Sequence, residues 1–87
     1  MEREALRRLI RRKLAEGTLP RERAARVWAG RGGGERCDAC GETIVSAQFL
    51  IEALREEGPS LYFHLECFYF WDALRRTRED GEPASEG

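Results

Sequence analysis

Four residues of this chain have the types and spacing of metal ligands. Cys37 and Cys40 form a C-x₂-C pair, and His64 and Cys67 form an H-x₂-C pair after 23 intervening residues. These are all the cysteines and the only histidine of the chain. Three thiolates and one imidazole are typical of closed, tetrahedral Zn²⁺ sites, and two residues between cysteines let both sulfur atoms reach one ion. Gly41 suits the positive φ that such a turn often needs. The pattern predicts one structural Zn²⁺.

Two other interpretations of the cysteines stay open. The thiols and His64 could simply be core residues, or the C-x₂-C pair could be a redox motif, although the strand–helix–strand context of a thiol–disulfide oxidoreductase is missing. Catalysis is not expected, because four protein ligands close the metal site and leave no spare thiol or histidine base. We therefore expect neither an enzyme nor a small-molecule substrate.

The composition is that of one small domain. The chain has 87 residues and a net charge of −1, and 41 % of its residues are hydrophobic, which is too apolar for a disordered chain. A core of this size often needs a staple such as a metal. Three cysteines cannot all pair within one chain, and neither a signal peptide nor an apolar run long enough to span a membrane is visible. The sequence therefore predicts a cytoplasmic protein with no membrane span.

An amphipathic helix is predicted over residues 2–16, ending at Gly17. Its apolar residues share one face at helical spacing: Leu6, Leu9, Ile10 and Leu14. We expect this stripe to dock on the rest of the chain, because a short chain needs the core area; a membrane surface or a DNA major groove is the alternative. A second short helix is expected over residues 20–28, with an extended arm as the alternative.

Basic residues are concentrated near the N-terminus. Residues 1–36 carry eleven basic and five acidic side chains, whereas residues 37–87 carry four and eleven. The two halves could attract each other, or the basic half could bind DNA or RNA. The candidates for nucleic-acid contact are arginines of the first helix: Arg7, Arg8, Arg11 and Arg12.

The rest of the pattern predicts a loop, a hairpin and a helix. Residues 29–34 contain four glycines within five positions, which favours a loop. Alternating apolar residues predict strands over residues 48–54 and 61–64, joined as a β-hairpin. Helical spacing of the apolar residues then predicts a helix over residues 65–78.

This order of elements resembles a treble-clef zinc finger, and the ligand spacing is similar to the first half of a LIM-type module. The chain also resembles small bacterial proteins that pair an Arg-rich helix and a stretch with Trp and Gly with such a finger. The resemblance implies that Cys37 and Cys40 are the knuckle ligands, His64 the ligand at the hairpin's end and Cys67 the helix ligand. It does not choose a function, because treble clefs bind DNA, RNA or protein and sometimes catalyse reactions.

Six of the eight aromatic residues lie within residues 62–71, and four of them are consecutive: Phe68, Tyr69, Phe70 and Trp71. Four consecutive residues cover most of a helix circumference, so one small hairpin cannot bury them all. We expect Phe68 or Tyr69 to contact another surface. The leucine stripe or Trp28 is the first candidate for it, a partner subunit the second and a nucleic-acid base the third.

These observations predict a small α+β protein that is stapled by zinc. Four segments are expected: a basic helical arm over 1–29, a Gly-rich linker over 30–36, a treble-clef-like finger over 37–78 and a flexible tail over 79–87. The expected function is a non-catalytic regulatory or adaptor module that binds another protein or a second copy of itself, with Phe68 and Tyr69 as candidate interface residues. DNA or RNA binding through the basic arm is the alternative.

Overall fold

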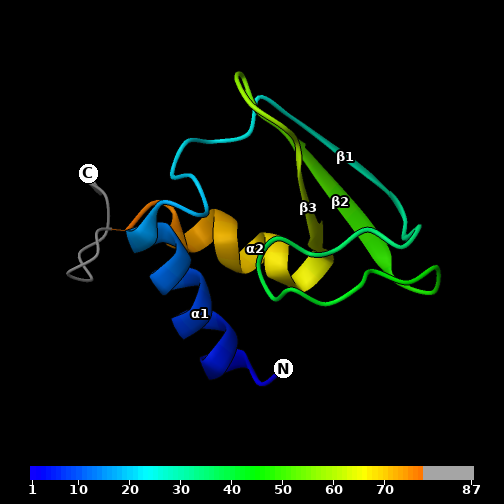
Figure 1. The fold of residues 1–87 in the computed structure, drawn as a ribbon, viewed down its shortest axis with the longest axis horizontal. Coiled ribbons are helices and arrows are strands. Elements are labelled where there is room, and N and C mark those ends of the chain that lie inside the picture. Colours follow the sequence, from blue (N-terminus) through cyan, green and yellow to red (C-terminus); the bar gives the residue numbers. More distant parts are fainter. Residues whose placement is uncertain (78–87) are drawn as a thin grey trace.

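Two helices and three antiparallel strands make up residues 1–77, the part of the chain that this computed structural model describes (Figure 1). In chain order they are α1 (Arg3–Glu16), β1 (Arg26–Arg31), β2 (Phe49–Leu54), β3 (Leu61–His64) and α2 (Leu65–Leu74). The predicted small α+β architecture is confirmed. The tail expected over residues 79–87 lies outside the described part.

The sheet has the order β1-β2-β3, with both neighbouring pairs antiparallel. The hairpin of β2 and β3 is therefore confirmed. Helix α2 packs against β2 and β3, and α1 packs against α2, so the molecule is built as sheet, helix and helix (Figure 1). No helix within residues 1–77 has the length and apolar character needed to cross a membrane.

Helix α1 matches its prediction closely at both ends. The Glu2 carboxylate caps the helix by accepting hydrogen bonds from the backbone amides of Glu4 and Ala5, at 3.1 and 3.2 Å. These bonds lower the pKa of Glu2. At the other end Gly17 has φ +85°, and its amide donates to the Leu14 carbonyl. A left-handed residue at this place costs glycine little, which explains why the helix ends there.

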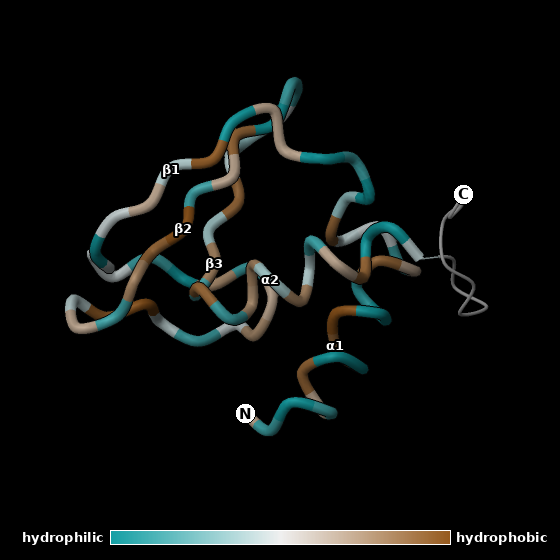
Figure 2. The backbone as a smooth tube through the Cα atoms, turned by 180° about the vertical axis from the view of Figure 1, so that it is seen from behind, coloured by the Kyte–Doolittle hydropathy of each residue, from teal (hydrophilic) through white to brown (hydrophobic). Residues whose placement is uncertain are grey.

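The apolar stripe of α1 contributes to the core, which confirms that this helix docks on the rest of the chain. Leu6, Ile10 and Leu14 are buried, and α1 lies along α2. Figure 2 shows hydrophobic and hydrophilic stretches alternating along α1, as an amphipathic helix requires. The centre of the core is a stacked pair of rings, Phe63 and Trp71, with centroids 5.0 Å apart.

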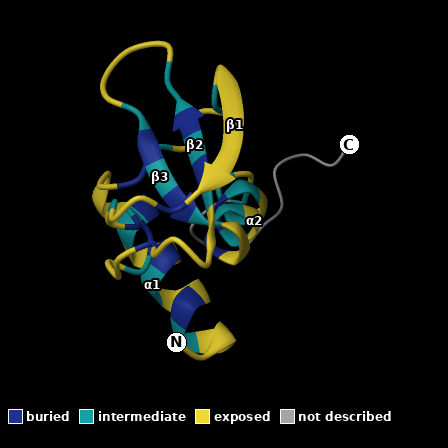
Figure 3. Ribbon diagram, turned by 90° about the vertical axis from the view of Figure 1, so that its right-hand side faces the viewer, coloured by how far each residue is buried: buried dark blue, intermediate teal, exposed yellow. Residues whose placement is uncertain are grey.

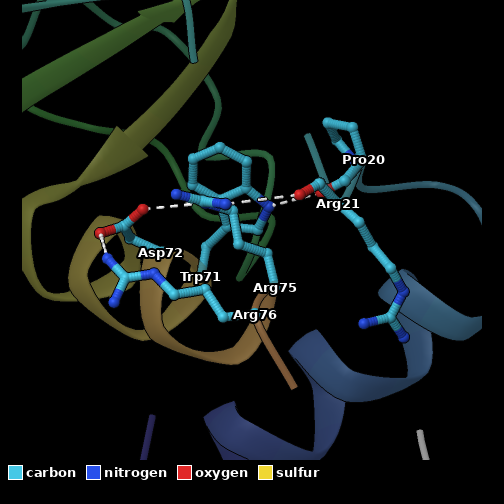
Figure 4. Close-up of polar contacts among 6 residues, drawn as sticks. All are labelled: Pro20, Arg21, Trp71, Asp72, Arg75 and Arg76. Carbon is cyan, nitrogen blue, oxygen red and sulfur yellow. Dashed lines mark hydrogen bonds and ion pairs between the residues drawn. The ribbon is translucent and has the colours of Figure 1, made fainter. Parts of the chain in front are cut away.

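The second helix expected over residues 20–28 is wrong. Residues 20–25 form no helix, and β1 begins at Arg26 and pairs with β2 along its whole length. Two influences favour the strand. The Pro20 carbonyl accepts a hydrogen bond from Trp71 Nε1 at 3.0 Å, which fixes the chain on α2 (Figure 4). Val27 and Trp28 are also residue types that fit a pleated surface.

The glycine run is only partly the loop that was expected, because Gly30 and Arg31 belong to β1. Strand β1 therefore crosses the position where a boundary between arm and linker was placed, between residues 29 and 30. Helix α2 ends at Leu74, earlier than the predicted residue 78. There the Thr77 hydroxyl donates to the Leu74 carbonyl at 2.8 Å, which satisfies an acceptor at the helix end.

Candidate metal centre

The four predicted ligands converge on one point of the structure. The three sulfur atoms of Cys37, Cys40 and Cys67 and a ring nitrogen of His64 all lie within 4.8 Å of one another. His64 Nδ1 is 3.4 Å from Cys40 Sγ and 3.9 Å from Cys67 Sγ. Ligand atoms around one tetrahedral Zn²⁺ lie roughly 3.5–4 Å apart, as its bond lengths require. The cluster could therefore hold one metal ion.

Cys37 and Cys40 are positioned by a tight backbone turn over residues 37–42, which we call the knuckle. The Gly41 amide donates to the Cys37 carbonyl at 2.9 Å, and the Cys37 amide donates to the Glu42 carbonyl at 2.9 Å. Gly41 has φ +84°, so the expected positive φ is confirmed. The Cys40 amide donates a hydrogen bond to Cys37 Sγ at 3.5 Å, and such a bond stabilises a thiolate.

His64 and Cys67 come from the junction of β3 and α2. His64 is the last residue of β3 and precedes the first turn of α2, which contains Cys67. His64 Nδ1 faces the thiols, while Nε2 lies 3.3 Å from the Thr43 carbonyl. A carbonyl can only accept, so Nε2 carries the proton and Nδ1 keeps its lone pair for a metal. Thr43 thus fixes both the orientation and the tautomer of the ring.

Lys13 supports the knuckle from α1. Its Nζ donates to the carbonyls of Asp38 and Ala39, at 3.0 and 2.9 Å, between the two knuckle cysteines. Sequence reasoning missed this role. The available signal was that Lys13 is the only lysine of a chain with fourteen arginines. Lysine offers a compact charge with three donors on a flexible stem, which suits two convergent carbonyls.

Asp38 joins the knuckle to the outer edge of β3. Its backbone amide donates to the Tyr62 carbonyl at 2.7 Å, and its carboxylate accepts from the Tyr62 amide at 2.8 Å. These two bonds satisfy the outward backbone groups of Tyr62. The knuckle is consequently held by the sheet as well as by α1.

The three thiols differ in their affinity for protons. A hydrogen bond with Cys67 lowers the pKa of Cys37 to about 4. The same bond raises the pKa of Cys67, and burial raises the pKa of Cys40. Thiolates so close together repel each other, so they need a cation to be deprotonated together. This is the behaviour of a ligand set for a positive ion.

The arginines proposed to contact nucleic acid all lie on α1 and are exposed. Arg7 has a contact within the chain, since its guanidinium carbon is 5.1 Å from the centre of the Phe70 ring. The other three extend the exposed basic surface of the helix: Arg8, Arg11 and Arg12.

The two candidate interface residues have different surroundings. Phe68 is half-buried against the rings of Phe63 and Trp71. Tyr69 is 62 % exposed. Trp28 does not cover them, because it pairs with Glu52 and so points to the sheet face opposite α2. The α1 contact with an aromatic side chain of α2 is made to Phe70 instead.

The case for a metal centre therefore rests on the geometry of four side chains and on the contacts that orient them. Two segments far apart in the sequence supply the donors, and three hydrogen-bonding partners hold these segments: Thr43, Lys13 and Tyr62. Comparison with protein-family models, with curated proteins and with solved structures found no match to this chain.

Proposed function

We propose that this protein is a non-catalytic zinc-binding module with a treble-clef arrangement. The convergence of three sulfur atoms and His64 Nδ1 within 4.8 Å carries the proposal. Thiolate and imidazole donors suit Zn²⁺, and calcium or magnesium would prefer oxygen ligands. The order of knuckle, β2–β3 hairpin and ligand-bearing helix α2 supports the treble-clef assignment.

The role proposed for the ion is structural. Four protein ligands complete a tetrahedral shell, so no position is left for a water or a substrate. The ion joins the knuckle, the end of β3 and the first turn of α2. Hydrogen bonds between Asp38 and Tyr62 already connect the knuckle to β3, and the ion would add a connection from the knuckle to α2.

Metal analysis of the purified protein tests this function. Native mass spectrometry should show one zinc per chain. Chelation should unfold at least residues 37–77, because zinc binding and folding are coupled, and the unfolding should appear as a loss of circular dichroism signal and of the thermal transition. Cys40→Ser should behave like chelation. Ser46→Ala is the matched control, because Ser46 is exposed and outside the ligand set. A folded protein whose melting curve ignores complete zinc removal would contradict the proposal.

A protein partner is the proposed target of the module. Large apolar side chains are exposed on the described surface, among them Val27, Trp28, Phe49 and Tyr69. Exposed apolar groups favour a protein contact that survives salt. The outward arginines of α1 favour nucleic acid as the second candidate, and that binding should weaken steeply with salt and with Arg8, Arg11 and Arg12 changed to Ala.

A further inference from the structure

The outer edge of β1 is open, whereas the opposite edge of the sheet is closed. At β3 the knuckle residue Asp38 satisfies the outward backbone groups of Tyr62. At β1 all six residues are exposed, which Figure 3 shows as a continuous yellow strand beside the partly buried β2 and β3. An open edge of this length is a template for another strand.

The register shows which backbone groups of β1 face outward. The Gly32 amide donates to the Gln48 carbonyl, which continues the pairing of Arg31 with Phe49. In an antiparallel ladder alternate residues bond to the neighbouring strand, so Gly30 and Trp28 face β2 with their backbone groups. The amides and carbonyls of the residues between them point away from the sheet: Val27, Ala29 and Arg31. Within residues 1–77 no hydrogen bond outside the ladder reaches these groups.

A groove lies beside this edge, between the start of β1 and α2. Val27 pairs with buried Ala53, so its side chain lies on the α2 side of the sheet. There Val27, Ala24 and Phe68 provide the apolar part of a groove of about 340 Å³. Val27 is 44 % exposed, because α2 does not extend far enough to cover β1.

The charge of the groove is positive. Three arginines and one acid line it: Arg23, Arg75, Arg76 and Asp72. The Asp72 carboxylate accepts hydrogen bonds from two guanidinium groups, at 2.9 Å from Arg75 Nε and at 2.8 Å from an Arg76 nitrogen (Figure 4). One carboxylate cannot neutralise three arginines, so the groove attracts anionic groups.

We propose that this groove binds an extended acidic peptide of a partner protein, which adds to β1 as a fourth strand. Its backbone would pair with the outward groups of Val27 and Ala29. Every second side chain of the added strand would point into the groove, apolar ones against Val27 and Phe68 and acidic ones against Arg23 and Arg76. The inference rests on the protein-binding function proposed above and specifies its partner.

The observations favour a peptide over the other occupants. A strand edge presents donors and acceptors in turn, and a peptide backbone matches both, whereas a nucleic-acid backbone offers phosphate acceptors and no matching donors. In a second copy the added strand would be β1 itself, which carries Arg26 and Arg31 and no acidic residue. It would therefore supply no carboxylate to the three arginines of the groove.

Peptide display against the zinc-loaded full chain tests the proposal. A library of random nine-residue peptides should yield sequences in which apolar and acidic residues occupy every second position, so that both kinds lie on the face toward the groove. Ala29→Pro removes one outward amide without touching the β1–β2 ladder and should weaken the selected peptide at least tenfold. Val27→Asp should do the same through charge and lost apolar contact. Val45→Asp is the matched control, because Val45 is exposed to a similar extent, 48 %, away from the groove.

Each variant is first checked for one zinc per chain and an unchanged circular dichroism spectrum, so a failure of the metal site is seen separately. Zinc-loaded, folded protein that selects no peptide overturns this inference and leaves the zinc module intact. Selected peptides that bind Ala29→Pro as well as the wild type also overturn it. So does a dimer in sedimentation that Ala29→Pro dissociates, or an oligonucleotide that displaces the peptide with higher affinity.

Discussion

Lys13 connects the first helix to the knuckle through two hydrogen bonds to backbone carbonyls, at 3.0 and 2.9 Å. Lys13→Met keeps most of the apolar stem and removes the charged donor. We expect a loss of roughly 1–3 kcal/mol in the free energy of unfolding, because two half-buried carbonyls lose a charged partner. Chemical denaturation of the zinc-loaded protein measures it. Arg12→Met, the same type of change at an exposed neighbour, should alter stability by less than about 0.5 kcal/mol. Equal effects of the two changes would contradict the assigned role.

Gly32 lies where two backbone segments approach each other. A Cβ atom at this position would be 2.2 Å from the Val45 carbonyl oxygen and 2.5 Å from that of Ile44. Backbone cannot move aside as a side chain can, so Gly32→Ala should destabilise the protein by roughly 1–3 kcal/mol. Thermal unfolding measures this. Gly30→Ala is the control, since an added Cβ there meets nothing within 4 Å. A Gly32→Ala protein as stable as the control would show that the glycine loop does not pack on residues 44–45.

The thiol pKa values give the zinc affinity a definite pH dependence. The raised pKa values of Cys67 and Cys40 keep both thiols protonated at neutral pH, whereas Cys37, with a pKa of about 4, is already a thiolate. Zinc must therefore displace at least two protons, and the apparent affinity should fall at least about a hundredfold for each unit that the pH drops. Chelator competition between pH 7.5 and 6 measures the slope. A slope of less than two protons per zinc would mean that Cys40 and Cys67 do not both bind the ion.

At the scale of elements, α1 depends on its buried stripe. Ile10 is fully buried on the side of α1 that faces the core, so Ile10→Ala should lower the free energy of unfolding by roughly 2–4 kcal/mol. Leu65→Ala, at an exposed position of α2, should cost much less. Urea unfolding compares the two variants. If Ile10→Ala were as mild as the control, α1 would be a separate arm rather than part of the core.

The helices and the hairpin could be predicted because their signals are local. The stripe from Leu6 to Leu14, the Gly17 stop and the alternation around Ile51 each lie within one element. Strand β1 could not be predicted in the same way. Val27 and Trp28 fit one side of a short helix as well as a strand, and their partner strand starts more than twenty residues later. Long-range pairing decided between the two structures.

In the candidate site, too, some residues could be predicted from the sequence and others could not. The four ligands could be identified because cysteine and histidine are rare in this chain and their spacing carries the chemistry. The residues that orient them could not. Thr43 and Asp38 act partly through backbone groups that have no sequence signature, and Lys13 binds two backbone carbonyls, a role indicated only by its being the single lysine. The groove at β1 was equally hidden, because it depends on a strand that was not expected.

At the scale of the whole molecule, the proposed metal and the apolar core depend on each other. Cys67 and Trp71 lie one turn apart on α2. Trp71 stacks on Phe63, and Phe63 directly precedes the ligand His64 in the chain. Releasing the ion would free the start of α2 and with it the ring pair at the centre of the core. Loss of zinc should therefore also destabilise α1, which packs on α2.

Tryptophan fluorescence can report this coupling. Trp71 is buried and Trp28 is 54 % exposed on the open side of the sheet, so Trp28→Phe leaves Trp71 as the single reporter of the core. On chelation its emission should move to longer wavelength, with the same midpoint as the loss of helical circular dichroism, because one cooperative core contains both helices. Adding zinc back should reverse both signals. If Trp71 kept its buried emission while zinc was fully removed, the core would be stable without the metal, and the ion would stabilise only the knuckle.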